Sequence, residues 1–160
     1  MFGKSTLINK MSKKNSLQIG NKPGVTKSNQ WVRIANNQEL LDTPGVLWPK
    51  FDNKDISLNL SFIGSIKDEI LDQTEIAIEL LYKLMKDYNK NVLERYKISN
   101  EELQEIGDIK KENMYKLLNL IAKKTGSISQ GGNVDEEKVS RILINDFRTC
   151  KIGKITLERI

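Results

Sequence analysis

The chain opens with Met1-Phe2-Gly3-Lys4-Ser5-Thr6, and this stretch decides the fold. It matches the second half of the phosphate-binding pattern G-x-x-x-x-G-K-[ST], in which backbone N–H groups surround the phosphates of a nucleotide. Neither the first glycine of that pattern nor the strand that leads into it stands ahead of Gly3. We therefore expect a nucleotide site whose leading part is missing.

Two further stretches follow in the order that a GTPase requires. Residues 40–45, Leu-Leu-Asp-Thr-Pro-Gly, form a short apolar strand that runs into D-x-x-G, the pattern that contacts magnesium and the γ-phosphate. Thr26 lies between the two, where such proteins place a switch hydroxyl. G-K-S-T alone can also arise at a capped helix start, but the order and spacing of the three motifs indicate a nucleotide site.

Each residue type has a chemical reason to be there. A triphosphate with its magnesium needs a cation on the β- and γ-phosphates and hydroxyls on the metal and the γ-phosphate, which Lys4, Ser5 and Thr26 would supply. We expect a GTP site with Mg²⁺ held by Ser5, Thr26 and, through water, Asp42. The predicted nucleotide-binding residues are Phe2, Gly3, Lys4, Ser5, Thr6, Thr26 and Gly45.

Two features differ from ordinary GTPases. Val46 stands where many of them carry the glutamine that orients the attacking water, so no catalytic side chain is identified. The guanine-reading motif N-K-x-D does not occur after Asp42, and residues 52–55, Asp-Asn-Lys-Asp, are expected to form a solvated loop. A circular permutation, which places the guanine motif ahead of the phosphate loop, accounts for this order.

Longer stretches resemble one family of permuted GTPases, ribosome biogenesis GTPase A, also called YlqF. The stretches are residues 3–10, 23–32, 40–51 and 64–68, followed by Leu93-Glu94-Arg95-Tyr96, the pair Gly131-Gly132 with Asp135, and Asp146-Phe147-Arg148. The resemblance therefore covers essentially the whole chain. Met1 and Phe2 depart from the family's loop, and the family's N-terminal part, with the guanine motif and the first strands, is absent.

The resemblance implies a GTPase that acts in assembly of the large ribosomal subunit, with the subunit precursor and ribosomal RNA as partners. It implies slow intrinsic hydrolysis that depends on the ribosomal particle and on a monovalent cation such as K⁺. From the missing front of the site we expect this chain alone to bind nucleotide weakly, without guanine selectivity, and to have little or no activity.

Composition favours a soluble intracellular protein, which we expect to be a cytoplasmic monomer. The 160 residues are 38% hydrophobic and 29% charged, and the sequence holds no apolar run of membrane-spanning length and no signal peptide. Cys150 is the single cysteine, which excludes a disulfide framework, and the absence of histidine excludes histidine acid–base chemistry within the chain.

The charge is distributed unevenly. Lys and Arg against Asp and Glu number 9 and 4 in residues 1–62, 6 and 11 in 63–108, and 11 and 6 in 109–160. Basic ends suit a polyanionic partner, although solvated helix faces give the same pattern; the family resemblance favours RNA. The candidate phosphate contacts are Lys110, Lys111, Lys123, Lys124, Arg141 and Arg148.

The expected fold class is α/β: a truncated P-loop GTPase domain over residues 1–63, then a small all-α domain over 64–160 that binds RNA or the ribosome. In the first, a helix from Ser5 should carry Leu7, Ile8 and Met11 on one face, and strands 30–34 and 39–42 should form a hairpin around Asn36-Asn37. Trp31 is expected in the core, and Trp48 is expected to transmit nucleotide state.

Three amphipathic helices are expected in the second domain. The first should run from Ile66 and bury Ile70, Leu71, Thr74, Ile78, Leu81 and Leu84 with it, and the second should bury Met114, Leu117, Leu118 and Ile121 and end near Gly126. The third should begin at an Asp135 cap and bury Val139, Ile142, Leu143 and Phe147.

Three other functions remain open. The chain could be a defunct GTPase whose helical domain binds RNA or ribosomal protein without nucleotide, or a gene fragment with no independent fold. A P-loop ATPase or kinase of unrelated type is disfavoured by Thr26 and the D-x-x-G spacing.

Overall fold

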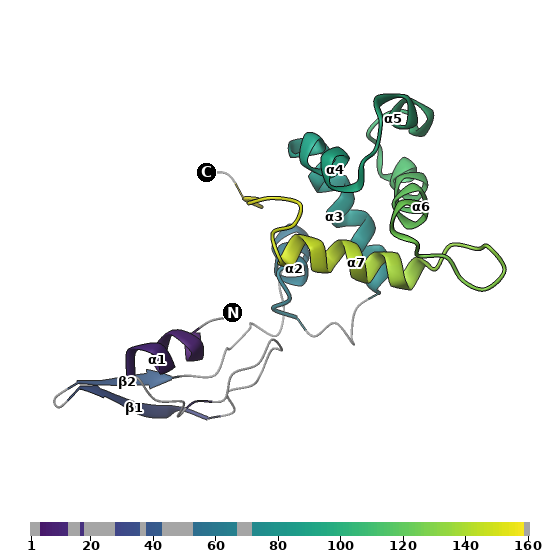
Figure 1. Cartoon of the computed structure of the whole chain (residues 1–160). Helices are drawn as coiled ribbons and strands as arrows, with labels where there is room; N and C mark the ends of the chain where they lie inside the picture. Colours follow the sequence, from purple (N-terminus) through teal and green to yellow (C-terminus); the bar gives the residue numbers. More distant parts are fainter. Residues whose placement is uncertain are drawn as a thin grey trace. The chain divides into compact units, whose positions relative to one another are not determined.

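A computed structural model describes residues 4–12, 17, 28–35, 38–42, 53–66 and 72–158 (Figure 1). The contacts between residues divide the chain into two compact units, 1–69 and 70–160. Within the described ranges no helix is long and apolar enough to cross a lipid bilayer.

The first unit is built on a helix and a hairpin. Helix α1 (Lys4–Ser12) precedes the antiparallel strands β1 (Gln30–Ala35) and β2 (Gln38–Asp42), and helix α2 (Lys54–Phe62) follows. α1 lies alongside the two strands (Figure 1), and its contact with them buries Ile8, Leu17 and Val32, with Leu40 packed against them. The hairpin is where the sequence predicts it; Asn36 and Asn37 lie outside the described residues.

The position of Trp31 corrects the sequence prediction. Its side chain is 68% exposed, because successive strand residues point to opposite faces and Val32, its neighbour, is the one directed at α1. Trp31 pairs across the hairpin with Leu41, which is 39% exposed on the same face.

Helix α1 also buries a different side from the one expected. Leu7 and Met11 are 60% and 49% exposed, whereas Asn9 and Ser12 are buried together with Ile8. The buried side of this helix is therefore partly polar, and a hydrophobic pattern alone cannot find it.

Residues 53–55 are not the expected solvated loop. Asn53 caps α2, since its side-chain oxygen accepts a 2.8 Å hydrogen bond from the Asp55 amide, and the helix begins at Lys54. Asparagine is among the best helix caps, and an acidic residue in the first turn favours the positive end of the helix dipole.

The second unit contains α3 (Gln73–Asp87), α4 (Asn89–Tyr96), α5 (Asn100–Ile106), the 3₁₀ turn η2 (Lys111–Asn113), α6 (Met114–Thr125) and α7 (Glu136–Arg148). α3 packs against α4, α6 and α7, and α6 packs against α7. Side chains with no accessible surface fill the centre: Leu80, Leu81, Leu84, Val92, Leu117, Leu118, Ile121 and Leu143. An isolated bridge between Ile128 and Val134 closes the loop between α6 and α7.

Two of the three expected helices are present as predicted. The predicted face of α6 is buried, and Gly126 ends the helix with a left-handed φ of 68°. Asp135 caps α7 by accepting a 2.9 Å hydrogen bond from the Lys138 amide. Of the predicted α7 core residues, only Ile142 is half-exposed; Val139, Leu143 and Phe147 are buried.

The helix expected to run from Ile66 begins later than predicted. Ile66 precedes it, and Asp72 starts α3 by accepting hydrogen bonds from the amides of Thr74 and Glu75 at 2.9 and 3.1 Å. A carboxylate that satisfies two free N–H groups of a first turn is a stronger start signal than apolar spacing. The predicted residues Ile78, Leu81 and Leu84 are buried, Thr74 is half-buried, and Ile70 and Leu71 lie outside the described residues.

Candidate nucleotide site

Asp42, Ser5 and Lys4 meet at one point of the first unit. The Ser5 hydroxyl donates a 3.1 Å hydrogen bond to Oδ2 of Asp42, and the Lys4 ammonium lies 2.9 Å from Oδ1. Asp42 is the last residue of β2, and Ser5 and Lys4 open α1, which packs against that strand. The end of a strand and the start of a helix thus bring together residues that are 37 positions apart.

These groups suit a magnesium-bound phosphate. The Asp42 side chain is only 1% exposed, so its charge needs a cation, and the Ser5 hydroxyl beside it offers a second hard oxygen. Mg²⁺ prefers oxygen ligands and is usually held by one or two protein groups together with water and substrate phosphates. The start of α1 adds the positive end of a helix dipole.

In such a site two anions, the Asp42 carboxylate and a bound phosphate, compete for the Lys4 ammonium. It pairs with the Asp42 carboxylate while its side chain remains 43% exposed. A bound phosphate would draw the ammonium away from Asp42 and leave the carboxylate to the metal. The ion pair therefore holds Lys4 at the site in the absence of ligand.

Asn9 is a supporting residue that the sequence analysis missed. Its side-chain amide donates to the Leu17 carbonyl at 2.9 Å and accepts from the Leu17 amide at 3.0 Å, and Asn9 is 4% exposed. This pairing satisfies both backbone groups of Leu17 and so ties the chain beyond α1 back onto that helix. Its only sequence signal was a polar residue beside Ile8 in a helix with few apolar positions.

The other predicted nucleotide-site residues form two groups, one within and one outside the described part of the chain. Thr6 is half-buried in α1. Phe2, Gly3, Thr26 and Gly45 lie outside the described residues, as do Val46 and Trp48.

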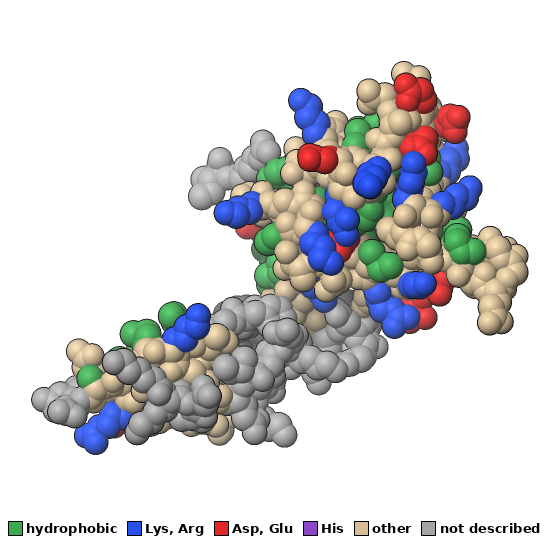
Figure 2. Space-filling model, in the orientation of Figure 1, with side chains coloured by type: hydrophobic (Ala, Val, Ile, Leu, Met, Phe, Trp, Pro, Cys, Tyr) green, Lys and Arg blue, Asp and Glu red, His purple; other side chains and the backbone are tan. Residues whose placement is uncertain are grey.

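The predicted phosphate-contacting residues lie on the second unit, and most hold carboxylates. Lys110 pairs with Asp108 at 3.3 Å, Lys111 with Glu79, Lys124 with Glu102 at 2.7 Å, and Arg141 with Glu137 at 3.0 Å. Figure 2 shows basic side chains spread over this unit, with several acidic ones near α5 and others elsewhere on the same face. Intramolecular pairing of this kind lowers the net charge that each lysine offers to a polyanion.

Lys123 differs from its neighbour Lys124. It is exposed on α6, and within residues 72–158 it takes part in no ion pair. Arg148 is half-buried at the end of α7. Of the six predicted contacts, Lys123 has the least intramolecular competition for a phosphate.

A lysine and a hydroxyl at the start of a helix, facing a buried aspartate at the end of a strand, define the class of phosphate-binding-loop proteins. The profile of a protein family described as "50S ribosome-binding GTPase" matches residues 2–123. The chain belongs to this family of GTPases.

The chain is also similar in sequence to individual named proteins. The chain is 41% identical to ribosome biogenesis GTPase A of Bacillus cereus, over 98% of this chain and 50% of that protein. It is 40% identical to the protein of the same name from Bacillus pumilus, over 98% of this chain and 52% of the relative. The resemblance inferred from the sequence motifs is thus confirmed, and the chain spans about half the length of these relatives.

A solved structure shows the same fold. It is described as the GDP-bound structure of TM YlqF, and it superposes with a TM-score of 0.63 over 98% of this chain and 56% of that one, at 22% identity. The P-loop GTPase fold expected from the first six residues is therefore supported by both sequence and structure.

Proposed function

We propose that this chain supplies the phosphate- and magnesium-binding part of a circularly permuted GTPase that acts in assembly of the large ribosomal subunit. The observation that carries the proposal is the convergence of Lys4, Ser5 and Asp42. In this proposal Phe2 to Thr6 and Gly45 bind the phosphates of GTP, and Thr26 joins Ser5 and Asp42 at Mg²⁺.

Guanine recognition uses an N-K-x-D motif, and hydrolysis uses a side chain that orients water. No N-K-x-D motif follows Asp42, so the nucleotide is held by its phosphates alone, weakly and without preference for guanine. An aliphatic Val46 cannot orient water, so hydrolysis is slow and relies on the ribosomal particle and a monovalent cation such as K⁺. Replacing Val46 by Ala in the intact GTPase should lower the rate less than replacing Lys4 or Thr26.

The partner in this proposal is a precursor of the large subunit. Relatives that are about 40% identical to the chain over the aligned half of their length carry ribosome biogenesis in their names, and the description of the matching family names 50S binding. The all-α part from residue 64 contacts ribosomal RNA through its basic residues, while residues 1–63 carry the nucleotide, in a cytoplasmic monomer.

The test is magnesium-dependent nucleotide binding by the 160-residue chain. Titration with a fluorescent GTP analogue should show weak binding that ATP displaces equally well and that chelation of Mg²⁺ weakens. Ser5→Ala and Asp42→Asn should each lose about tenfold in affinity, since each removes one metal-facing group. Matched controls are Ser57→Ala, whose hydroxyl donates to the Asn53 carbonyl in α2, and Lys10→Ala on α1.

Three outcomes contradict the proposal in different ways. Tight binding of GTP but not ATP would show that a guanine reader lies within the chain. Equal losses in Ser5→Ala and Ser57→Ala would remove Ser5 from the site. Absence of nucleotide binding with retained binding to ribosomal RNA would instead support a helical unit that acts without nucleotide.

A further inference from the structure

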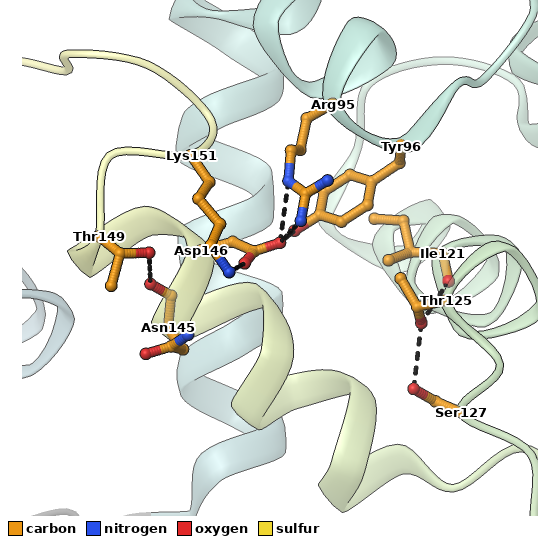
Figure 3. A network of polar contacts seen from close by, with 9 residues as sticks. All are labelled: Arg95, Tyr96, Ile121, Thr125, Ser127, Asn145, Asp146, Thr149 and Lys151. Carbon is orange, nitrogen blue, oxygen red and sulfur yellow. Dashed lines mark hydrogen bonds and ion pairs between the residues drawn. The ribbon is translucent and has the colours of Figure 1, made fainter.

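Two cations converge on one buried carboxylate in the second unit. The Asp146 side chain is 2% exposed; its Oδ2 accepts from Nε of Arg95 at 3.0 Å and lies 2.7 Å from a terminal guanidinium nitrogen. The Lys151 ammonium lies 3.2 Å from Oδ1, and the Tyr96 hydroxyl lies 3.4 Å from Oδ2. Figure 3 shows Arg95, from α4, and Lys151, from the turn after α7, reaching the carboxylate from opposite sides.

The backbone around Lys151 fixes its position. The Lys151 amide donates to the Asp146 carbonyl at 2.8 Å, and the Cys150 amide donates to the Phe147 carbonyl at 3.0 Å. Cys150 has a left-handed φ of 58°, which turns the chain at the end of α7, and Ile152 is buried at 3% exposure. Lys151 is thus anchored on both sides, unlike a lysine on a free helix face.

The cluster carries more positive charge than the carboxylate needs. One cation neutralises Asp146, whereas two are present, so one positive charge is in surplus. The side chains of Arg95 and Lys151 are 35% and 53% exposed, while Asp146 is buried. A guanidinium has five N–H donors and an ammonium three, so donors remain on both groups after they bind Asp146.

We propose that Arg95 and Lys151, positioned by Asp146, form a phosphate-binding pair with which the second unit contacts the backbone of ribosomal RNA. The proposal rests on the RNA partner in the proposed function, and it assigns the contact to residues outside the six predicted from charge. A guanidinium and an ammonium, each held on a different oxygen of the same carboxylate, can each bind an oxygen of a phosphodiester. Lys154, exposed three positions beyond Lys151, extends the positive charge along the chain.

The inference is tested by measuring binding to protein-free RNA extracted from 50S subunits over a range of KCl concentrations. Lys151→Gln leaves the Arg95–Asp146 pair intact and should weaken binding about fivefold and lower the slope of log K against log salt by about 1. Lys151→Arg should restore both. The matched control is Lys86→Gln, which removes an exposed lysine of α3 that is not among the six candidates, and should change binding less than twofold.

Each outcome bears on a different claim. If wild type binds and Lys151→Gln matches it in affinity and salt slope, the phosphate pair is wrong and the proposed function stands. If wild type binds no RNA, the RNA partner of the proposed function is wrong and the pair falls with it. If Lys151→Gln weakens binding to intact 50S subunits but not to the extracted RNA, the contact is with a protein and the inference is overturned.

Discussion

Nε of Arg95 donates to the carboxylate of Asp146 and joins α4 to α7 across 51 positions of the chain. These residues belong to two stretches, 93–96 and 146–148, that drew attention in the sequence only as separate similarities to a family. In the structure, Arg95 of the first stretch and Asp146 of the second form one ion pair. The partners of Asp146 are Arg95 and Lys151, which lie outside the short Asp146-Phe147-Arg148 motif.

Replacing Asp146 by Asn should destabilise the second unit. The change removes the anion that holds Arg95 and Lys151, and loss of one partner from a buried ion pair typically costs about 3–5 kcal/mol. Because both cations reach solvent, we expect about 2 kcal/mol in urea unfolding. Asp108→Asn, which breaks an exposed pair with Lys110, should change stability by less than about 0.5 kcal/mol. Equal effects of the two substitutions would show that Asp146 is no anchor.

Tyr96 should make the fold sensitive to alkali. Burial, and next the charge of Asp146, raise the pKa of the Tyr96 hydroxyl above its usual value near 10.0. The unfolded chain then loses this proton at lower pH than the folded one, so stability falls as pH rises above about 10. Tyr96→Phe should flatten that fall, which is measured by unfolding between about pH 8 and 11, a range that spans the ordinary tyrosine pKa. Tyr115→Phe, on an exposed ring, is the control and should leave the fall unchanged.

Asn9 should matter more to stability than an ordinary polar helix residue. Asn9→Ala leaves the amide and carbonyl of Leu17 without their partner, and an unsatisfied buried group costs about 1–3 kcal/mol. We expect a loss of about 2 kcal/mol and faster hydrogen exchange at the Leu17 amide. Lys10→Ala, one position along α1, should change neither. An unchanged exchange rate in Asn9→Ala would contradict the assignment.

Lys124 and Glu102 should behave as a coupled pair. Glu102 accepts from Lys124 and also from the Ser99 amide at the start of α5, and both interactions lower its pKa. The stabilisation they give is present above the unfolded pKa of Glu102 and is lost as pH falls through the folded one. Reversing either charge alone should destabilise the chain at neutral pH, where the pair is ionised, and this loss should shrink as pH falls through the folded pKa of Glu102. The double exchange Glu102→Lys with Lys124→Glu should recover part of the loss.

Because Lys124 pairs with Glu102, RNA binding by the basic residues is better tested at Lys123 than at Lys124. A reversal at Lys124 disturbs α5 as well as any RNA contact, whereas Lys123 has no carboxylate partner among the described residues. Lys123→Glu should therefore weaken RNA binding without changing the unfolding midpoint. A matching drop in both would mean that the effect is structural.

The sequence predicted elements where one local signal dominates. The apolar spacing of α6 and the Asp135 cap of α7 agree with the structure because helix period and cap point to the same boundaries. Trp31 was mispredicted because tertiary contacts set which face of a strand is buried, and the start of α3 was mispredicted because the Asp72 cap is a stronger start signal than apolar spacing. The convergence on Asp42 followed from known motif chemistry, but the pairing of Asn9 with Leu17 has only a weak sequence signal, a polar residue beside Ile8.

The hairpin of the first unit has a consequence for handling the protein. Among the described residues the sheet holds β1 and β2, and the face away from α1 presents Trp31 beside Leu41. Unpaired strand edges next to apolar side chains are templates for pairing with another chain. Arg33 and Glu39, opposite each other on that same face, interrupt the apolar surface with charge. Solubility at high concentration should accordingly depend on these two side chains, and their replacement by Val and Ile should turn a clear solution into one that scatters light.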